Sequence, residues 1–322
     1  MPTWHPTATL ETLKKRAAIL QQIRQFFAAR HILEVDTPLL SHASVTDPHI
    51  HAIPAFFKTY GASSEQALYL QTSPEYAMKR LLAAGSGSIF QLCKAFRQGD
   101  LGKIHNPEFT MLEWYHLNFD HHALMNEVDE LLQGILQTPP AERFSYAALF
   151  EKFLNLNPHT ASLPELINCA RQHAIQFTTE TSDKNLWLEL LLTHCIEPHI
   201  GREKPVFLYD FPITQAALAR IRYDETPPVA SRFEVYFKGV ELANGFHELQ
   251  DANEQRKRFI TDLDYRTEHH LPHPPIDENF LAALTAGLPN CSGVALGVDR
   301  LIMLALNLSS IEEVLSFSFQ NS

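Results

Sequence analysis

The sequence predicts an α+β protein in which an antiparallel β-sheet is flanked by helices. Three segments support this fold class. Residues 90–109 have the pattern of a strand, a glycine-containing turn and a second strand, and residues 232–249 have the pattern of paired strands. Residues 292–306 begin as a strand of small residues and continue as an apolar helix.

Near the N-terminus, apolar side chains recur at helical spacing and lead into the segment Val35-Asp36-Thr37-Pro38. This spacing predicts an amphipathic helix that buries one face. The apolar positions are Leu13, Ala17, Leu20, Ile23 and Phe27.

The predicted hairpin at residues 90–109 can aim three different groups into one cleft. Arg97 can grip a phosphate and a carboxylate bidentately, His105 can reach the outer phosphates of a nucleoside triphosphate, and Phe109 can stack on a purine. Together these groups suit ATP. A purely structural hairpin is the alternative interpretation.

Two glycines and an Asp-Arg pair mark the junction of strand and helix in residues 292–306. Gly293 and Gly297 allow another group to approach the backbone closely, and Arg300 could cover the second face of a purine stacked on Phe109. The glycines lie within the predicted strand and form no G-x-G-x-x-G pattern, which argues against a dinucleotide-binding turn.

Three glutamates, Glu234, Glu241 and Glu248, recur along the paired strands of residues 232–249, although their seven-residue spacing does not fix a common face. Carboxylates beside triphosphate oxygens are natural ligands of Mg²⁺. A magnesium site and a solvated strand edge are both consistent with this pattern.

The segment between these blocks is rich in leucine at helical spacing, notably in residues 127–132 and 185–192, and predicts a helical insertion around residues 120–205. A chain of 322 residues, 45% of them hydrophobic, can bury a large core, and we expect a single domain over residues 1–322. The histidine-rich stretch at residues 268–275 is broken by prolines, so it predicts a surface loop rather than a metal site.

Composition limits the partners of the protein. The four cysteines show no zinc spacing, and the absence of a signal peptide or a membrane-spanning apolar run predicts a cytoplasmic protein with reduced thiols. With 26 Lys and Arg against 37 Asp and Glu, the formal net charge is −11. Nucleic-acid binding draws on a cationic surface, so this balance argues against a nucleic-acid partner.

In their order along the chain, these blocks resemble the three motifs of the class II aminoacyl-tRNA synthetase catalytic domain. Residues 35–38 resemble motif 1, Phe96-Arg97 with His105 and Phe109 resembles motif 2, and residues 293–300 resemble motif 3. Within this class the chain resembles the lysine group, and more closely its truncated paralogues that ligate (R)-β-lysine to a lysine of translation elongation factor P. The stretches that carry the resemblance are residues 72–76, 105–115, 241–248 and 291–300.

The resemblance implies an ATP-dependent ligase that forms an aminoacyl-adenylate, with Mg²⁺ beside the phosphates and a homodimer paired through motif 1. Arg97, His105 and Arg300 are the implied catalytic residues. Glu234 and Glu241 are the implied metal ligands. The implied ATP-binding residues are Arg97, Gln98, Gly99, His105, Asn106, Phe109, Glu241, Leu242, Gly297 and Arg300.

The resemblance also implies a pocket for the side-chain ammonium of the substrate, formed by Glu75, Tyr115 and Glu248. A buried pair of glutamates is costly unless a cation satisfies it, which makes such a pocket selective for an amine. Glu75 could instead cap the helix that follows it, or serve both purposes. The implied substrate-binding residues are Ser73, Pro74, Glu75, Tyr115, Asn244, Glu248 and Ala295.

Two positions depart from the pattern of the lysine group. Gly99 stands where those synthetases have a glutamate, and whether the neighbouring Asp100 replaces it stays open. Ala295 stands where they have glycine. One extra methyl group in a tight pocket can displace an α-amino group, which favours the β-amino isomer of lysine.

Motif 1 begins within the first 40 residues, so we expect no anticodon-binding domain and a protein acceptor, elongation factor P, in place of tRNA. Two other functions remain open. One is an enzyme that aminoacylates tRNA or a small amine. The other is a catalytically silent regulator on the same fold, which Gly99 in motif 2 makes conceivable.

Overall fold

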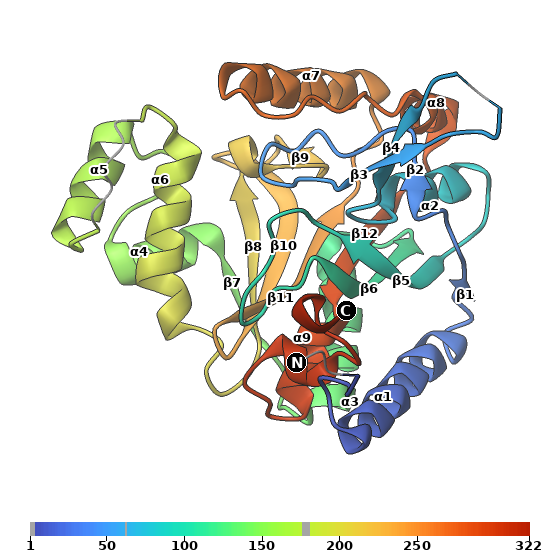
Figure 1. Ribbon diagram of the computed structural model, residues 1–322. Helices are drawn as coiled ribbons and strands as arrows, with labels where there is room; N and C mark the ends of the chain where they lie inside the picture. Colours follow the sequence, from blue (N-terminus) through green and yellow to red (C-terminus); the bar gives the residue numbers. More distant parts are fainter. Residues whose placement is uncertain (1–3, 62, 176–180) are drawn as a thin grey trace. The chain divides into compact units, whose positions relative to one another are not determined.

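The structure is a computed structural model that describes residues 4–61, 63–175 and 181–322. Figure 1 traces the chain and labels its elements. The chain divides into two compact units. The first unit consists of Met1–Phe119 and Gln250–Ser322, and the second unit consists of Asp120–Leu249.

The sheet of the first unit contains four strands in the order β1-β5-β6-β12. Strands β5 (Ile89–Phe96) and β6 (Glu108–Leu117) form an antiparallel hairpin, as the sequence predicts. Strand β12 (Cys291–Gly297) pairs antiparallel with β6, and the short β1 (Leu33–Glu34) pairs parallel with β5. Motifs 2 and 3 therefore lie on adjacent strands of one sheet.

One face of this sheet is covered by helix α1 (Leu10–Ala28), which begins after Thr9, whose side chain accepts a hydrogen bond from the backbone N–H of Thr12. Phe27 of α1 stacks on Phe90 with the ring centroids 4.4 Å apart and meets Trp114 edge-on at 5.3 Å. Successive side chains of a strand point to opposite faces. The neighbours of Trp114 along β6 therefore point to the face away from α1.

Three helices of the first unit pack together: α2 (Glu75–Ala83), α7 (Ala252–Glu268) and α8 (Glu278–Gly287). Tyr76 of α2 stacks on Phe280 of α8 with a centroid distance of 4.5 Å. After α7, residues 269–277 form no helix or strand, which confirms the loop predicted for the histidine-rich stretch. Helix α9 (Val298–Ala305) follows β12 directly, as predicted.

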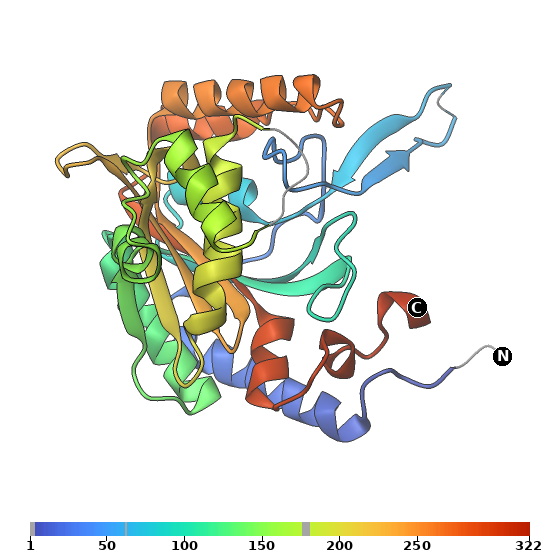
Figure 2. The ribbon, with the colours of Figure 1, turned by 90° about the vertical axis from the view of Figure 1, so that its left-hand side faces the viewer.

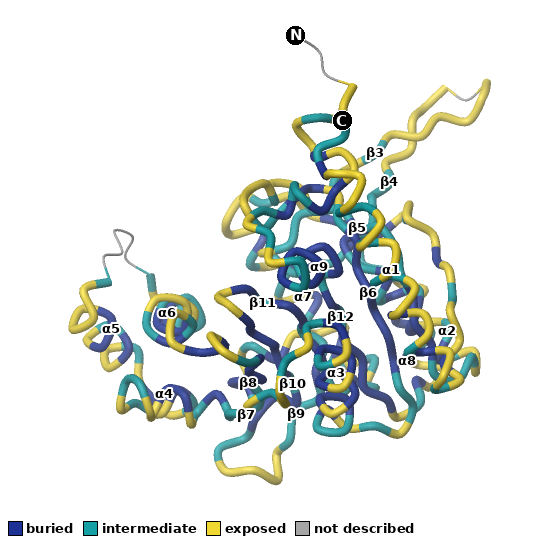
Figure 3. Tube along the Cα trace, turned by 90° about the horizontal axis from the view of Figure 1, so that it is seen from below, coloured by how far each residue is buried: buried dark blue, intermediate teal, exposed yellow. Residues whose placement is uncertain are grey.

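A small antiparallel sheet in the first unit has the order β2-β4-β3, with β2 at Leu40–Ser41, β3 at Pro54–Phe57 and β4 at Gln66–Leu70. Strands β3 and β4 extend away from the rest of the unit (Figure 2). They are mostly exposed (Figure 3). Phe56 of β3 is 70% exposed.

The sheet of the second unit has the order β11-β10-β8-β7, with β9 (Ile221–Arg222) also paired to β10. Strands β10 and β11 are antiparallel, which confirms the paired strands predicted for residues 232–249. Strand β8 is antiparallel to β10, and β7 is parallel to β8. The bounds are Glu142–Ser145 for β7, Val206–Pro212 for β8, Val229–Phe237 for β10 and Val240–His247 for β11.

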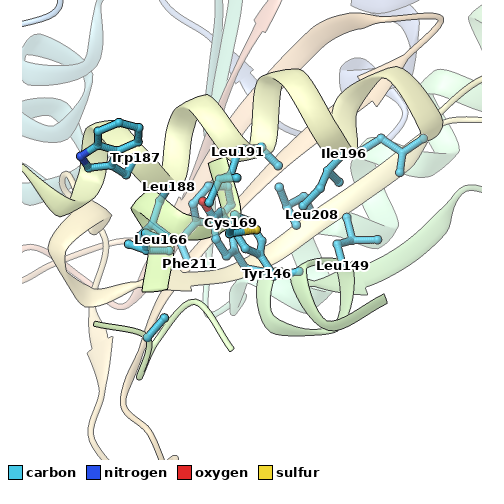
Figure 4. Packing of buried hydrophobic residues seen from close by; sticks show 14 of the residues in the cluster. Tyr146, Leu149, Leu166, Cys169, Trp187, Leu188, Leu191, Ile196, Leu208 and Phe211 are labelled. Atoms are coloured by element: carbon cyan, nitrogen blue, oxygen red, sulfur yellow. The ribbon is translucent and has the colours of Figure 1, made fainter. Parts of the chain in front are cut away.

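Helices occupy most of the remaining second unit, within the range predicted to be helical. They are α3 (His121–Leu136), α4 (Tyr146–Leu154), α5 (Leu163–Gln172) and α6 (Lys184–Leu191), and a π-helical turn at Leu192–Ile196 continues α6. Side chains of α4, α5, α6 and β8 form a buried hydrophobic cluster (Figure 4). In this cluster Tyr146 stacks on Phe150 with a centroid distance of 4.6 Å.

Among the described residues, no helix is both long and apolar enough to span a membrane. The described chain contains no disulfide bond.

Candidate active site

The face of the first unit's sheet opposite α1 collects the candidate site residues of β6. Phe109 and Tyr115 lie on this face because they are separated from Trp114 by an odd number of positions. Residues paired directly across antiparallel strands point to the same side. Tyr115 is paired with Gly293, and Glu113 is paired with Ala295 of β12. Motif 3 thus contributes small residues beside the larger side chains of motif 2.

Arg97 follows the last residue of β5 and is fixed by a backbone hydrogen bond from its N–H to the carbonyl oxygen of Pro107, at 2.9 Å. Its guanidinium carbon lies 5.2 Å from the centroid of the Phe109 ring. The hairpin therefore brings a guanidinium and an aromatic face together, and the predicted phosphate-binding role of Arg97 stays a prediction.

His105 lies in the loop between β5 and β6, where its backbone exchanges hydrogen bonds with that of Gly102. Arg300 of α9 donates a hydrogen bond of 2.7 Å to His105 Nε2 and another, from Nε, to the carbonyl oxygen of Ile104 at 3.2 Å. Burial and the positive charges of Arg300 and Arg97 lower the pKa of His105. The imidazole is therefore neutral and accepts the bond from Arg300.

Gly297 and Asp299 lie close to Arg300 in the sequence. A Cβ atom at Gly297 would lie 3.4 Å from Cδ of Arg300, an ordinary van der Waals contact, so the Arg300 side chain packs beside this glycine. Asp299 is buried, accepts a hydrogen bond from the Thr110 N–H at 2.7 Å, and pairs with Arg16 of α1 at 2.6 Å. This contact joins the three motif regions of the first unit.

The loop after Arg97 contains the departure at Gly99. Gly99 has φ of +90° and no atom within 4 Å of a Cβ placed on it, so the turn, rather than a neighbouring side chain, favours glycine here. Gln98 is exposed and donates its N–H to the carbonyl oxygen of His51 at 2.8 Å. The negative charge of Asp100 raises the pKa of His105 and so opposes the lowering caused by burial and the two arginines. Asp100 is thus placed near the predicted phosphate-binding imidazole.

Asn106 is buried and its side chain is engaged inside the protein. Its Nδ2 donates to the carbonyl oxygen of Glu108 at 2.6 Å, and its Oδ1 accepts from the N–H of Phe319 at 3.0 Å. This residue ties the loop before β6 to the C-terminal segment. Its predicted contact with the nucleotide stays a prediction.

A network formed by the buried Glu113 and the half-buried Glu75 lies where the amino-acid pocket is predicted. Ser73 Oγ donates to Glu113 Oε2 and Tyr115 Oη donates to Glu113 Oε1, both at 2.7 Å. Ser73 Oγ also accepts from the N–H of Glu75 at 3.0 Å, while the Glu75 carboxylate accepts from Lys79 Nζ at 2.6 Å. Ser73 therefore holds the start of α2, after Pro74, and the side chain of Glu75 is not its cap.

Glu113 is a residue of this network that the sequence analysis missed. Burial and the nearby Glu75 raise its pKa from 4.5 to about 8, and the hydrogen bonds from Tyr115 and Ser73 oppose that rise. A buried carboxylate with a raised pKa beside a polar cluster is a functional-site candidate. Strand alternation could have identified it, because Glu113 shares the parity of Phe109 and Tyr115.

The second unit carries the other candidate residues on the β10–β11 hairpin. Glu234 is paired with Asn244 across the two strands. The Glu234 carboxylate accepts from Arg232 Nη2 and from Tyr236 Oη, each at 2.5 Å, and Arg232 Nε donates to Asn244 Oδ1 at 3.3 Å. Burial alone would lower the pKa of Arg232, but the charges of Glu234 and Glu241 raise it.

A β-bulge sets the face of Glu241. The register shifts between Val235 and Tyr236, so that Leu242 has no partner in the β10–β11 register and Glu241 pairs with Tyr236. In a regular strand, Glu241 and Asn244 are three positions apart and would point to opposite faces. The bulge therefore places Glu241 on the same face as Glu234. Glu248 follows β11, is 1% exposed, and is bridged to Ala219.

Two sets of candidate residues thus form, one in each unit. The first unit gathers Ser73, Glu75, Arg97, His105, Phe109, Tyr115, Ala295, Gly297 and Arg300, and adds Glu113. The second unit gathers Glu234, Glu241 and Asn244, with the buried Glu248 at the end of β11.

Comparisons with known proteins identify the family of this chain. The family described as tRNA synthetases class II (D, K and N) matches residues 4–321. Three relatives, each named elongation factor P–(R)-β-lysine ligase, come from Salmonella schwarzengrund (strain CVM19633), Salmonella heidelberg (strain SL476) and Salmonella agona (strain SL483). Each is 53% identical over 317 residues, which cover 98% of this chain and 97% of the relative.

These matches confirm the predicted fold class and the predicted resemblance. With nearly the whole sequence covered, the chain belongs to the class II tRNA synthetase family of the D, K and N group.

Proposed function

We propose that this protein is an ATP-dependent ligase that activates (R)-β-lysine as its adenylate and transfers it to the ε-amino group of a lysine on elongation factor P. The observation that carries this function is the 53% identity, over 98% of the chain, to ligases of that name. The candidate residues retained in both units support an active enzyme rather than a silent regulator.

In the first step, a carboxylate oxygen of the amino acid attacks the α-phosphorus of ATP, and the bond to the bridging oxygen of the β-phosphate breaks as pyrophosphate leaves. Such a reaction depends on positioning and charge neutralisation. Arg97 would hold both the α-phosphate and the attacking carboxylate, and Phe109, 5.2 Å from its guanidinium carbon, would stack on the adenine.

Arg300 would form the second face of the adenine site. Arg300 donates hydrogen bonds to His105 and to the carbonyl oxygen of Ile104, so adenine binding would exchange these bonds for a stacking contact. That exchange would free His105 Nε2, and the imidazole would donate to the outer phosphates once its proton is on Nε2. Leu242 has a buried side chain, and the bulge leaves its backbone without a partner in the β10–β11 register. A contact of Leu242 with the nucleotide would therefore be through its backbone.

Glu234 and Glu241 would hold Mg²⁺ beside the phosphates. Both are hard oxygen donors, which this ion prefers, and the bulge places them on one face. Each oxygen of Glu234 accepts one hydrogen bond and keeps a further lone pair for a metal. The ion would neutralise phosphate charge, while Arg232 and Tyr236 would hold the Glu234 carboxylate in position.

The buried carboxylates of the first unit would recognise the ammonium groups of the substrate. Glu75 already has an internal cation, Lys79, at 2.6 Å. Glu113, with its raised pKa, would be the carboxylate that a substrate ammonium converts to its charged form. Ala295 is paired with Glu113, so its methyl group borders the same space and would favour the β-amino isomer.

In the second step, the ε-amine of the acceptor lysine attacks the acyl carbon of the adenylate. A C–N bond forms, the C–O bond to AMP breaks, and the amine loses a proton. Because the acceptor is a translation factor, the reaction would take place in the cytoplasm.

Pyrophosphate exchange and transfer test this function separately. Purified enzyme should exchange labelled pyrophosphate into ATP faster with (R)-β-lysine than with L-α-lysine, and should then label elongation factor P but not tRNA. Elongation factor P with its acceptor lysine changed to arginine is the matched control. Efficient charging of tRNA with lysine, without labelling of elongation factor P, would refute the proposal in favour of a tRNA synthetase.

A further inference from the structure

The second unit contains a cluster of metal-binding side chains that the proposed reaction does not use. His121 and His122 open helix α3, and Asp210 lies near the end of β8. One potential ligand atom from each residue lies within 4.8 Å of the others. The cluster joins residues from two elements of the same unit, so it does not depend on how the two units are placed.

The geometry of the central pair resembles two ligands on one ion. His121 Nε2 and Asp210 Oδ1 are 3.2 Å apart. Two ligands on a tetrahedral Zn²⁺ with bonds of about 2.0–2.1 Å are separated by about 3.3 Å. A metal ion could therefore replace the proton between these two atoms with little movement. The ring centroid of His122 lies 4.1 Å from that of His121, so His122 can supply a third ligand.

A second observation is the buried ring of His121. Its side chain is 2% exposed, and its Nδ1 makes no hydrogen bond to any described residue. Buried polar atoms normally have a partner. Among the described hydrogen bonds, only the one between Nε2 and Asp210 orients the ring, and it aims Nε2 at the carboxylate, whereas a metal at Nε2 would leave Nδ1 as it is.

The surrounding charges favour a cation. Asp120, the N-cap of α3, and Asp210 contribute two negative charges against one positive charge from Arg222, which leaves one net negative charge with neutral imidazoles. Arg222 Nη2 lies 2.5 Å from Asp210 Oδ1 and its Nη1 lies 3.5 Å from Glu225. Arg222 thus competes with a metal for Asp210 and has a second carboxylate to which it can turn.

We propose that His121, His122 and Asp210 bind a divalent transition-metal ion of the zinc class, with water in a fourth position. Two imidazoles and one carboxylate suit Zn²⁺, whereas Mg²⁺ prefers oxygen ligands alone. The ion would join the start of α3 to the end of β8. Phe211, the residue after Asp210, contacts the Arg232 guanidinium at 4.5 Å, so the site would also steady the strand that supports Arg232.

Titration of chelator-treated enzyme with Zn²⁺ at neutral pH, without ATP, tests this proposal. We expect one equivalent to bind in a saturable manner and to raise the melting temperature. Co²⁺ in place of Zn²⁺ should give the intense visible absorption of a tetrahedral site. Absence of saturable binding, or a Co²⁺ spectrum of the hydrated ion alone, would overturn the proposal.

Variants assign the ligands. His122→Ala and Asp210→Asn should each weaken Zn²⁺ binding by at least about tenfold, whereas His194→Ala, an exposed histidine of the same unit, should leave it unchanged. Arg222→Gln should strengthen binding, because it removes the competing cation. His122 is half-buried, so its variant keeps the test valid if Asp210→Asn does not fold. Equal affinity in His122→Ala and wild type, or weaker binding in Arg222→Gln, would identify an internal ion pair and no metal site.

Discussion

The buried Glu113 carboxyl accepts two hydrogen bonds and has a second carboxylate nearby. These surroundings have opposite effects on its pKa. Burial and the Glu75 charge favour its protonated form, while Tyr115 and Ser73 stabilise the anion. The balance leaves a pKa of about 8, so the ligand-free carboxyl is largely protonated at neutral pH. A substrate ammonium would shift that balance, which makes amino-acid binding sensitive to pH.

As the pH increases toward 8, the affinity for (R)-β-lysine should therefore increase by up to about tenfold per pH unit, because binding to the carboxylate releases one proton. Above pH 8 the affinity should be constant. Glu113→Gln should weaken binding and flatten this profile. The measurement is the dissociation constant from pH 6 to 9 by calorimetry in two buffers of different ionisation enthalpy. A wild-type profile that matches that of the variant would exclude Glu113 as the titrating group.

Stability should change with pH in the opposite direction. The folded-state pKa of Glu113 lies above its ordinary value of 4.5, so its stabilising contribution is complete below that value and is lost as the pH rises through about 8. Denaturant titration of wild type and Glu113→Gln at each pH gives the difference in their free energies of unfolding. This difference reports the contribution of Glu113 alone. A difference that is constant from pH 5 to 9 would contradict the raised pKa.

Ala295 determines which lysine isomer fits, if its methyl group fills the space of an α-amino group. Ala295→Gly should then raise the activation of L-α-lysine while leaving or weakening that of (R)-β-lysine, with a change of about tenfold or more in their ratio. Measuring kcat/KM for both amino acids in wild type and variant tests this. Recognition of the side-chain ammonium should persist, because Glu113 and Tyr115 are unchanged. An unaltered ratio would make Ala295 a packing residue.

At the scale of elements, the bulge in β11 gives Glu241 its predicted role by placing it on the face of Glu234. Glu241→Gln keeps the shape but removes the charge proposed to hold Mg²⁺, and adenylation should fall by about 10² to 10³ in rate without loss of fold. Glu225→Gln, an exposed residue of the same unit, is the matched control. Full pyrophosphate exchange in Glu241→Gln would refute the metal role.

The ion pair between Arg16 and Asp299 connects α1 to the start of α9 and, through the Thr110 N–H, to β6. Arg16→Met would leave the Asp299 carboxylate buried without its cation, which commonly costs about 3–5 kcal/mol. Lys15→Met, whose exposed pair with Glu11 contributes little, should stay within about 0.5 kcal/mol of wild type. Chemical denaturation measures both. Equal stability of the two variants would show that Asp299 finds another partner.

The sequence predicts helices and strands correctly where their residue pattern is local. It does not predict the parts of the site that depend on the register between paired strands. The hairpin of β5 and β6 and the junction of β12 with α9 follow from short runs of sequence. The bulge at Leu242 depends on the pairing of two strands, which the seven-residue spacing of the glutamates cannot show. His121 and Asp210 are 89 positions apart, so their contact leaves no local pattern.

At the scale of the whole molecule, the first unit exposes apolar side chains around motif 1. Leu33, Leu39 and Leu40 are 54%, 38% and 46% exposed, and in α1 Ile23 and Phe27 are buried while Leu13 and Leu20 are only partly so. Apolar side chains gathered in one region of the surface favour an interface between copies. The predicted homodimer is consistent with this surface and stays a prediction.

Light scattering at micromolar concentration should give the mass of a dimer. Leu40→Glu should shift the protein toward monomer, since it would place a charge in the interface. Ile260→Glu, at a similarly exposed apolar position of α7, should remain dimeric. A monomeric wild type, or dissociation in both variants alike, would contradict an interface at motif 1.

The bulge at Leu242 also constrains how the length of this chain can vary. Glu241 and Asn244 share a face because the bulge takes up Leu242, so a strand that lost one residue between them would pair regularly and keep Glu241 on the face of Glu234. The turn at Lys238 and Gly239, with φ of 51° and 75°, lies outside this stretch. A related strand without the bulge should therefore be one residue shorter between Glu241 and Asn244, whereas a change of length at the turn does not affect which face Glu241 occupies.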